Sequence, residues 1–396
     1  MRPRWQLYQG IYIHIPFCVH KCCYCDFASY QIQSPQVMEA YTRRLVEEIR
    51  AYEPDLPLSP TATIYFGGGT PSVLPPELLA QIVQALKDRR FWQHPAEATL
   101  EANPGTVTLE SLRAYRQLGF DRLSMGIQSF QPGELALMGR IHTAEEAAEA
   151  VQLAREAGFA RISGDLIYGY PTQTLAGVQD SLQKLIATGV DHISVYGLTV
   201  EEGTQLERQL AKGQLSLPPD EAVDAMYDYL MDALPQAGYQ RYEIANFARP
   251  GQESLHNQVY WHYLPYMAFG CGACRFNGKR RETSPAGIRE YIEGKPLEVE
   301  TLTPEIRREE LVFMSLRTRQ GLNLTEFQER TGTAFFPFYE TAWEECQSRG
   351  WLEQEGDNIH LTPQGMRFGN LAFETFLTVP PEAKKEKNIS RIAIIS

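Results

Sequence analysis

Four cysteines crowd into one short segment near the N-terminus of this 396-residue chain, where Cys18, Cys22, Cys23 and Cys25 fall within eight residues. Thiolates are the usual ligands of iron–sulfur clusters, and a four-iron cluster takes four ligands. Three thiols on one loop would leave one iron open, as a chelating cofactor or substrate requires. The three-then-two spacing of Cys18, Cys22 and Cys25 predicts such a site, and it disfavours the rival register that Cys23 offers.

The remaining three cysteines leave alternatives open. Zinc normally pairs two cysteine loops or adds histidines, and Cys271-x-x-Cys274 could supply the second half of a zinc site. Buried thiols are the simpler interpretation of that pair, whose role the sequence leaves open. Cys346 stands alone and is expected in the core. An odd total of seven cysteines in so long a chain argues against a disulfide framework and favours a reducing compartment, with the cytoplasm as the default.

The composition limits the classes of function. The length predicts two or three domains, and a hydrophobic content of 43% is enough for a large core. Lys plus Arg number 37 against 49 Asp plus Glu, which gives a net charge of −12, so we do not expect nucleic acid as the main partner. No apolar run approaches the roughly 18 residues that span a bilayer. The apolar stretch after the N-terminal arginines is broken by His14 and Pro16, so we expect no signal peptide.

Strand-like and helix-like segments alternate from residue 11 to about residue 200. The expected strands are 11–15, 63–66, a segment around Leu100, 122–127, 162–169 and 192–198. The expected helices between them are 36–52, 76–90, 109–118, 143–157 and 175–188. This alternation predicts an α/β fold with a parallel sheet and helical crossovers, curved into a partial barrel. In such folds functional residues gather in the loops after the carboxyl ends of the strands, where the cysteine segment also lies.

The chain is expected to divide into four parts. Residues 1–238 form the barrel and end with a helix over 219–237, and residues 239–300 form a region rich in glycine and aromatic residues. Residues 301–378 predict three helices, a hairpin and a last helix, as in a small winged-helix-like α+β domain. DNA binding is the alternative function of that domain, and its acidic residues oppose it. The Lys-rich tail, 379–396, is expected to be disordered.

The segment IYIHIPFCVHKCCYCDF resembles the opening of the radical S-adenosylmethionine (SAM) superfamily, in the branch that holds anaerobic coproporphyrinogen III oxidase and the HemW-type heme chaperones. Further motifs of that branch follow in order, and the resemblance extends from about Tyr12 to near Leu377. These motifs are GGGTPS at 67–72, LEANPGT at 100–106, GIQSF at 126–130, GRIH at 139–142, DLIYGYP at 165–171 and HNQVYW at 256–261. The resemblance implies a partial (β/α)6 radical SAM barrel.

The resemblance also implies a [4Fe–4S] cluster held by Cys18, Cys22 and Cys25, with its fourth iron chelated by the amino and carboxylate groups of SAM. One electron from a donor would then cleave SAM and release a 5′-deoxyadenosyl radical, and this chemistry belongs to the cofactor. Among the SAM residues, Arg140 suits a carboxylate, and Gln128 and Asp165 suit ribose hydroxyls. The residues assigned to SAM by position are Tyr12, Tyr24, Gly68, Gly69, Thr70, Glu101, Gln128, Arg140, Asp165 and Gly197.

Two features separate the oxidase from the chaperone. The oxidase pattern has a fourth cysteine two positions after the third, and this chain has Phe27 there. The motif HNQVYW is associated with heme binding in the chaperones, and imidazole is a common axial ligand of heme iron. The resemblance therefore assigns heme to His256, Asn257, Tyr260 and Trp261, with Tyr260 and Trp261 stacking on or lining a porphyrin face. The alternative is a packed loop with an internally hydrogen-bonded histidine.

The expected function is that of a cytoplasmic heme chaperone. It would bind heme through the His256 region and pass it to an acceptor hemoprotein, while the cluster and SAM control occupancy, assembly or release. The enzyme alternative is an oxygen-independent coproporphyrinogen III oxidase, an activity that we expect this chain to lack. A winged-helix regulator that senses heme is a third class, disfavoured by the acidity. A membrane-associated acceptor and a homodimer stay open.

Overall fold

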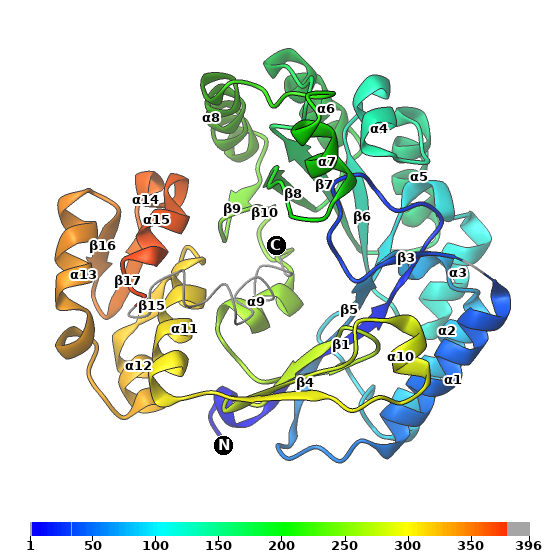
Figure 1. The fold of residues 1–396 in the computed structure, drawn as a ribbon, viewed down its shortest axis with the longest axis horizontal. Coiled ribbons are helices and arrows are strands. Elements are labelled where there is room, and N and C mark those ends of the chain that lie inside the picture. The colour runs from blue at the N-terminus through cyan, green and yellow to red at the C-terminus, as the bar shows by residue number, and fades with distance from the viewer. Residues whose placement is uncertain (1, 33, 378–396) are drawn as a thin grey trace.

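A curved twelve-stranded sheet forms the body of the protein, and helices cover its outer side (Figure 1). The structure, a computed structural model, describes residues 2–32 and 34–377, so the expectation for the tail at 379–396 lies outside the described residues. Six parallel strands follow one another in sheet order and confirm the predicted α/β partial barrel. They are β1 (Tyr8–Ile15), β4 (Leu58–Gly68), β5 (Ala98–Ala102), β6 (Arg122–Gln128), β7 (Arg161–Tyr168) and β8 (His192–Gly197).

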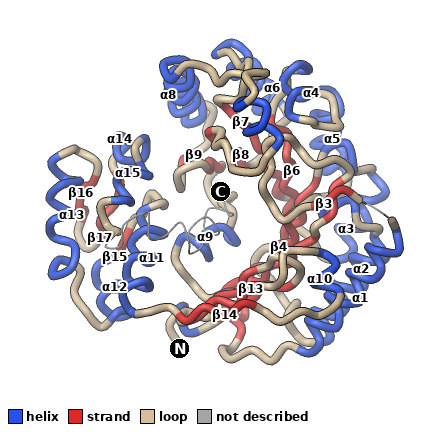
Figure 2. The backbone as a smooth tube through the Cα atoms, in the orientation of Figure 1, coloured by secondary structure: helices blue, strands red, loops and turns tan. Residues whose placement is uncertain are grey.

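Five long helices carry the chain back between these strands, as predicted, and line the outside of the arc (Figure 2). They are α1 (Pro35–Ala51), α2 (Pro76–Asp88), α3 (Leu109–Leu118), α5 (Ala144–Glu156) and α6 (Leu175–Ala187). Both α3 and α5 begin with a capping box, in which Thr108 pairs with Ser111 and Thr143 with Glu146. These side chains satisfy backbone N–H groups that have no partner inside the helix, which explains why the predicted bounds agree with the observed ones.

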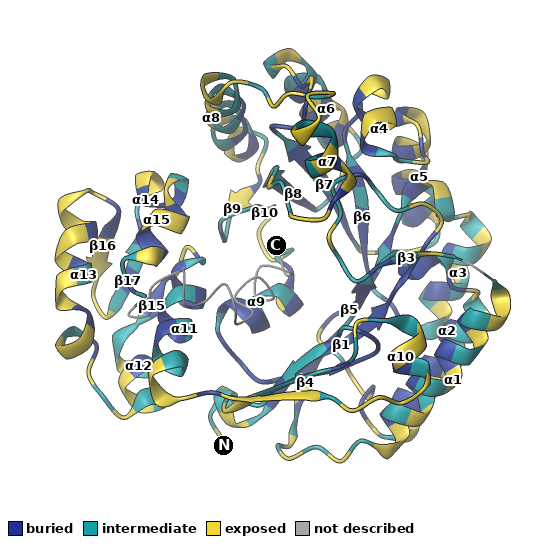
Figure 3. Cartoon of the chain, in the orientation of Figure 1, coloured by how far each residue is buried: buried dark blue, intermediate teal, exposed yellow. Residues whose placement is uncertain are grey.

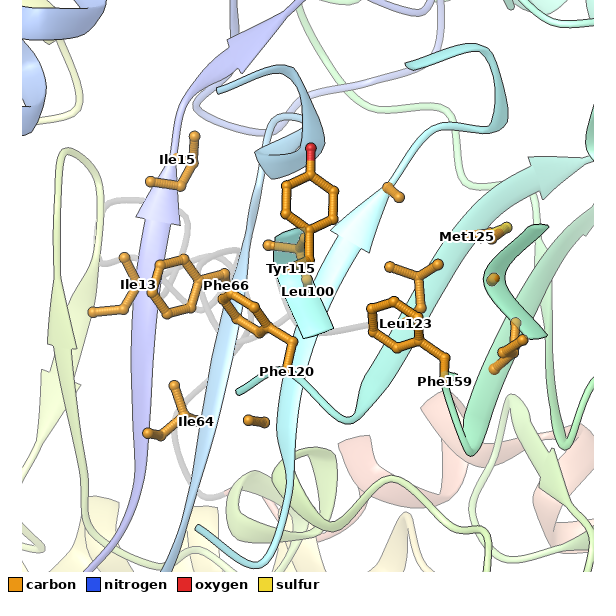
Figure 4. Close-up of a cluster of buried hydrophobic side chains, with 14 of the residues drawn as sticks. Ile13, Ile15, Ile64, Phe66, Leu100, Tyr115, Phe120, Leu123, Met125 and Phe159 are labelled. Carbon is orange, nitrogen blue, oxygen red and sulfur yellow. The ribbon is translucent and has the colours of Figure 1, made fainter. Parts of the chain in front are cut away.

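The main core lies between the sheet and these outer helices. Alternate residues of the strands, such as Ile13 and Ile15 of β1 and Phe66 of β4, are buried there against helix residues including Tyr115 (Figure 4). Because successive side chains of a strand point to opposite faces, the residues between them face the other way. Tyr12, for example, faces the inner side of the arc. The alternation therefore assigns one face of each strand to stability and the other to the site.

Short strands from the region 239–300 extend the sheet on both edges. Beside β1 lies the parallel strand β11, followed by the antiparallel strands β12, β13 and β14, while β10 and β9 follow β8 at the other edge. Their bounds are β9 (Gln240–Arg241), β10 (Asn246–Ala248), β11 (Tyr266–Phe269), β12 (Cys274–Phe276), β13 (Arg280–Thr283) and β14 (Glu298–Thr301). Strands of two to four residues give too little alternation to be recognised in the sequence, so the pattern there looked irregular.

Helix α9 (Leu255–Trp261) lies inside the arc, on the opposite side of the sheet from the five outer helices (Figure 1). Most of its residues are buried, in contrast to the outer helices, which expose one face to solvent (Figure 3). It carries the motif HNQVYW over its last six residues. The fold thus places this motif on the inner face, where His256 lies against Gly10 in the first half of β1 and Thr63 in the middle of β4.

The C-terminal part has its own core and the predicted winged-helix-like arrangement. Three helices pack with a small antiparallel sheet in the order β15-β17-β16, and two short helices follow. The bounds are α11 (Pro304–Leu316), β15 (Leu322–Asn323), α12 (Leu324–Thr331), α13 (Phe336–Ser348), β16 (Leu352–Glu355), β17 (Asn358–Leu361), α14 (Pro363–Arg367) and α15 (Gly369–Glu374). Cys346 is buried in this core, where its Sγ lies 3.0 Å from Thr375 Oγ1, as expected for a core thiol.

Several shorter elements complete the described chain. The predicted helix at 219–237 is α8 (Asp220–Gln236), whereas five short elements were not predicted. These are α4 (Pro132–Met138), α7 (Gln205–Ala211), α10 (Ile288–Ile292) and the strand pair β2 (Phe17–Cys18) with β3 (Tyr30–Gln31). Each is too short to show a hydrophobic period. No helix among the described residues is long and apolar enough to cross a membrane.

Candidate cluster and cofactor site

The inner side of the arc faces a cavity of about 1300 Å³. Its wall is formed by the cysteine segment, the carboxyl ends of the barrel strands, α9 and, opposite these, residues of the C-terminal domain. Every residue that the sequence assigned to the cluster, to SAM or to heme lines this cavity, with the exception of Trp261. Residues from distant parts of the sequence therefore line a single cavity.

The cysteine segment follows β1 and presents Cys18, Cys22 and Cys25 to the cavity. Each of the three thiols has a polar neighbour. Arg140 Nη1 donates to Cys22 Sγ at 3.2 Å, Thr70 Oγ1 donates to Cys18 Sγ at 3.6 Å, and Cys25 Sγ lies 3.7 Å from Ser29 Oγ. Burial raises the pKa of Cys18 and that of Cys25, the latter to about 11, so both thiols are protonated before they bind a metal.

Cys23 points away from the cavity. Its side chain is buried beside Gly139, since a Cβ built on that glycine would lie 3.5 Å from Cys23 Sγ. Its backbone N–H donates to the carbonyl of Met138 at 3.1 Å, which fixes the orientation of the turn against the end of α4. The structure therefore brings Cys22, and not Cys23, to the cavity together with Cys18 and Cys25.

A multi-iron cluster and a single zinc ion place different demands on these thiols. In a four-iron cluster each thiolate binds a different iron, whereas zinc needs its ligands around one point. Within residues 2–32 and 34–377, no group of three or more His, Cys, Asp or Glu side chains is placed to hold one ion. Cys271, which the zinc alternative would need, is fully buried in the main core, and burial raises its pKa to about 12. Its neighbour Cys274 lies at the cavity wall instead.

The glycine loop after β4 forms a cradle beside the cysteines. Gly68 has a φ of 112°, and a Cβ there would lie 2.5 Å from Cε1 of His14. A Cβ on Gly69 would lie 2.7 Å from the carbonyl oxygen of Phe17. A larger residue at Gly68 would therefore clash with the His14 ring, and one at Gly69 would clash with the backbone just before Cys18. The loop thus lies close to the strand that leads to Cys18, with Thr70 bonded to that thiol, as a cofactor bound next to a cluster requires.

Two half-buried carboxyl groups face the cavity from β5 and β7, the strands on either side of β6. Glu101 accepts hydrogen bonds from Tyr65 Oη at 2.6 Å and from the N–H of Gly68 at 3.1 Å. Asp165 accepts from Ser194 Oγ at 2.7 Å. Burial raises the pKa of Glu101 to about 7 and that of Asp165 to about 6. The hydrogen bonds that the two carboxyl groups accept lower these pKa values, but by less than burial raises them. A ligand that brings hydrogen-bond donors and positive charge would favour the ionised form of both.

Gln128 and Arg140 each offer a polar atom that has no partner among residues 2–32 and 34–377. Gln128 has a φ of 72°, which is rare outside glycine, and its Oε1 is buried without a hydrogen bond. Arg140 donates to Cys22 and to the carbonyl of Gly126, but its Nε is likewise buried and unbonded. Unsatisfied buried polar atoms are costly and rare in folded proteins. Their position in the cavity wall fits a polar ligand such as SAM.

The remaining SAM candidates also lie at the wall, in less diagnostic surroundings. Tyr12 Oη lies 3.0 Å from Nδ1 of His14. Tyr24 packs edge-to-face on Tyr170, with ring centroids 6.2 Å apart. Gly197 ends β8, and a Cβ there would lie 2.9 Å from Tyr168 Oη. These contacts show position and shape only.

His256 lies in α9, and the structure holds its ring on all sides. Nδ1 lies 2.7 Å from Thr63 Oγ1, Nε2 lies 2.7 Å from Tyr260 Oη, and the ring stacks on Tyr65 with centroids 5.0 Å apart. Burial lowers its pKa to about 3, so the imidazole is neutral at physiological pH. A neutral imidazole can bind iron, but a ring nitrogen becomes available only when Thr63 or Tyr260 releases it.

Glu97 fixes the start of α9. This fully buried carboxylate accepts the backbone N–H groups of Leu255 and His256, both at 3.1 Å, and pairs with Arg161 at 3.2 Å. A negative charge at a helix N-terminus satisfies free N–H groups and the helix dipole together. Glu97 was not among the predicted residues, because nothing in the sequence links position 97 with position 256.

Trp261 departs from its predicted place. Its ring is 1% exposed and packs in the core of the C-terminal domain rather than against the cavity. The structure therefore does not put this side chain on a porphyrin face, whereas Asn257 and Tyr260 of the same helix do line the cavity.

The opposite wall was not predicted. It includes the apolar residues Met314, Met366, Phe368 and Leu371 from the C-terminal domain. Six arginines also line the cavity, and of these only Arg140 was expected; they are Arg122, Arg140, Arg241, Arg281, Arg317 and Arg367. Single residues of this kind carry no spacing pattern, so only the folded chain brings them together.

Comparisons with known proteins agree with this geometry. Residues 12–185 match the family described as the radical SAM superfamily, and residues 302–368 match the HemN C-terminal domain. The chain is 34% identical to heme chaperone HemW of Lactococcus lactis, over 92% of this chain and 96% of that protein. It is 35% identical to heme chaperone HemW of Bacillus subtilis, over 93% of this chain and 99% of that protein.

A solved structure shares the whole fold. It is described as coproporphyrinogen III oxidase (HemN) from Escherichia coli, a radical SAM enzyme, and it matches with a TM-score of 0.81 over 95% of this chain and 91% of that one. The sequence identity is 23%, so this likeness concerns the fold alone. The shared fold includes the C-terminal domain that forms the far wall of the cavity.

Proposed function

The chain belongs to the HemW family of the radical SAM superfamily, and on that basis we propose that it is a heme chaperone, which binds heme in its central cavity and delivers it to an acceptor hemoprotein. The observation that carries the proposal is the similarity to several heme chaperones over almost the whole length of both chains. The cavity of about 1300 Å³, with polar atoms on one side and apolar side chains on the other, is large enough for a cofactor and a macrocycle together.

On the polar side, Cys18, Cys22 and Cys25 are proposed to hold a [4Fe–4S] cluster, which together with SAM supplies one-electron chemistry when bound. The Gly68–Thr70 loop and Glu101 would hold the amino acid part of SAM. Gln128 and Asp165 would accept its hydroxyl hydrogens, and Arg140 would bind its carboxylate. The support for these roles is that each group lines the cavity and that Gln128 Oε1 and Arg140 Nε have no other partner.

On the other side, His256 is proposed as the heme-binding residue. Tyr260 and Thr63 occupy its two ring nitrogens, so heme binding would have to break one of these hydrogen bonds. Tyr260 is the better candidate to move, because it lines the cavity itself whereas Thr63 belongs to a barrel strand. The packed, internally bonded histidine and the ligand histidine are then two states of the same side chain.

The proposal includes partners beyond heme. An electron donor would serve the cluster, and the cytoplasm is the proposed location. The acceptor is a hemoprotein, and a membrane-associated acceptor or a homodimer would be compatible with the fold. The alternative function, oxidation of coproporphyrinogen III, is favoured by the shared fold and opposed by Phe27, which stands where the oxidase pattern has its fourth cysteine.

An anaerobic heme titration tests the proposal. The cluster is reconstituted in the full chain, heme is added stepwise, and the Soret absorbance is followed in the wild type and in His256→Ala. We expect saturable binding by the wild type and a weaker, shifted spectrum for the variant. Saturable binding with an unchanged spectrum in His256→Ala would show that a residue other than His256 binds the heme iron. No heme binding by the wild type would refute the heme chaperone function.

A further inference from the structure

Arg317 is the cavity arginine that the protein leaves without an acceptor. It caps the C-terminal end of α11 and lines the cavity. Across the described residues its guanidinium forms neither an ion pair nor a hydrogen bond, and its Nε is completely buried. Burial lowers the pKa of Arg317, and attraction by the buried Glu243 only partly offsets this effect. An arginine stays charged even so, which leaves a desolvated cation without a bonded partner.

The other five cavity arginines are engaged. Arg281 pairs with Glu310 and Arg367 with Asp224, while Arg122 lies 4.0 Å from Glu97. Arg241 donates to the carbonyls of Glu243 and Ile244 and to the hydroxyl of Tyr227, and Arg140 donates to Cys22 and Gly126. Arg317 is thus the one of the six that, among the described residues, has neither an ion pair nor a hydrogen bond on its guanidinium.

Trp261 holds this free guanidinium in place. The centre of the guanidinium lies 4.5 Å from the centroid of the Trp261 ring and 5.8 Å from the centroid of the Phe313 ring. Stacking of this kind restricts the arginine without using its donors, which lie in the plane of the group. Because α11 packs against α9, the last residue of HNQVYW lies behind the cavity wall and supports a side chain that does reach the cavity.

The surroundings suit one ligand chemistry. Met314, Met366, Phe368 and Leu371 form an apolar wall from the same domain, and Phe368 and Leu371 are 40% and 49% exposed. An apolar surface beside one unpaired guanidinium suits a ligand with a flat apolar ring system and a carboxylate at its edge. Heme has that form, since its flat macrocycle bears two propionate groups.

We propose that Arg317, stacked on Trp261, binds a propionate carboxylate of the tetrapyrrole, and that the C-terminal domain thereby supplies the carboxylate-binding half of the heme site. This inference rests on the proposed function. Arg317 binds the ligand directly, and Trp261 is a positioning residue that acts through it. The arrangement also explains why a buried cation is kept in a position where a neutral side chain would stabilise the fold more.

The test compares hemin with hemin dimethyl ester, in which both carboxylates are blocked, by titrating the full chain with each. Hydrogen bonds to charged groups imply that the wild type binds hemin about tenfold or more tightly than the ester. Arg317→Met, which keeps length and apolar contact, should lose most of this preference, and Arg317→Lys should keep part of it. Arg319→Met is the matched control, because Arg319 is exposed two residues away and does not line the cavity.

Each outcome decides the inference. A wild-type preference that falls in Arg317→Met and persists in Arg319→Met supports it. Equal binding of both ligands by the wild type, or an Arg317→Met variant that keeps the full preference, overturns it while leaving the heme chaperone function intact. A wild type that binds neither ligand overturns both. The wild-type comparison needs no mutation, so the test stands even if a variant fails to fold.

Discussion

At the scale of single residues, the cysteine segment shows how a spacing argument and a structure complement each other. The sequence favoured Cys22 over Cys23 from spacing alone, and the structure turns Cys22 to the cavity and Cys23 to the end of α4. It also adds what spacing could not show. Arg140 donates to the Cys22 sulfur, and Thr70, from the glycine loop, donates to Cys18. The cluster and SAM candidates are thereby joined by direct contacts.

Replacing the cysteines of this segment one at a time should distinguish the cluster ligands from Cys23, which only lies next to them. We expect Cys22→Ser to lose most of the iron and the broad visible absorbance after anaerobic reconstitution, because a serine hydroxyl is a poor substitute for a thiolate. Cys23→Ser is the matched control and should retain both, since Cys23 is buried away from the cavity. Iron and sulfide analysis of the two variants measures this, and the reverse pattern would mean that the other register holds the cluster.

The half-buried carboxyl group of Glu101 makes SAM binding depend on pH. With a pKa raised to about 7 by burial, Glu101 is protonated in the empty site below neutrality, whereas the sulfonium charge and the donors of SAM favour its ionised form. Affinity for SAM should therefore rise as the pH rises through about 7, and Glu101→Gln should flatten this dependence. Equilibrium dialysis of reconstituted protein from about pH 6 to about pH 8 would show it. A Glu101→Gln profile as steep as that of the wild type would place the titrating group elsewhere.

At the scale of elements, the predicted helices and strands agree best with the observed ones where the segment is long and its ends are capped. The helix at 109–118 was predicted to the residue because Thr108 and Ser111 form a capping box at its start and Gly119 adopts a left-handed conformation at its end. The strands of 239–300 escaped prediction since pairs such as β9 and β10 are only two and three residues long and gain stability from the sheet edge they join. Tertiary pairing, which no local pattern encodes, decided these elements.

Candidate residues in the first two hundred positions were easier to place for a related reason. They follow long parallel strands, and the carboxyl ends of parallel strands meet at one edge. Glu97 and Arg317 could not be found this way, because their importance depends on α9, which packs against the sheet from a distant part of the sequence. The sequence therefore predicted the barrel residues and, from the motif HNQVYW, residues of α9 that line the cavity, but it missed Glu97 and Arg317.

The glycine loop offers a direct test of an element's geometry. Gly68→Ala places a Cβ 2.5 Å from His14 at a φ of 112°, so we expect it to lose about 1 to 3 kcal/mol of stability and to weaken SAM binding. Gly133→Ala is the control, because no atom lies within 4 Å of its built Cβ and α4 gains a better helix former. Thermal unfolding of both variants measures the difference. A Gly68→Ala variant as stable as Gly133→Ala would show that the loop adapts easily.

At the scale of the whole molecule, the cavity lies between two units, the barrel and the C-terminal domain. The barrel supplies the cluster and SAM candidates, and the C-terminal domain supplies the apolar wall and Arg317. One link between them is Arg367 of α14, which pairs with Asp224 at 2.8 Å and Asp228 at 2.5 Å, both on α8. These groups are partly exposed, so the link contributes little to overall stability.

We expect the Arg367 ion pairs to affect how readily the C-terminal domain opens away from the barrel, rather than the stability of the fold. Arg367→Gln is expected to change the free energy of unfolding by less than about 1 kcal/mol. It should nevertheless increase amide hydrogen exchange in α14 and α15, because the domain edge is no longer held to α8. Hydrogen exchange with mass spectrometry measures this, and raising the salt concentration should mimic the variant. Unchanged exchange in both cases would show that other contacts hold the domain closed.

The central claim is that this cavity carries heme rather than making its precursor. One anaerobic preparation of the reconstituted chain, with SAM and a reductant, can be given coproporphyrinogen III in one sample and heme in the other. The account predicts saturable heme binding and no formation of protoporphyrinogen IX. Production of protoporphyrinogen IX over many turnovers, without saturable heme binding, would contradict it.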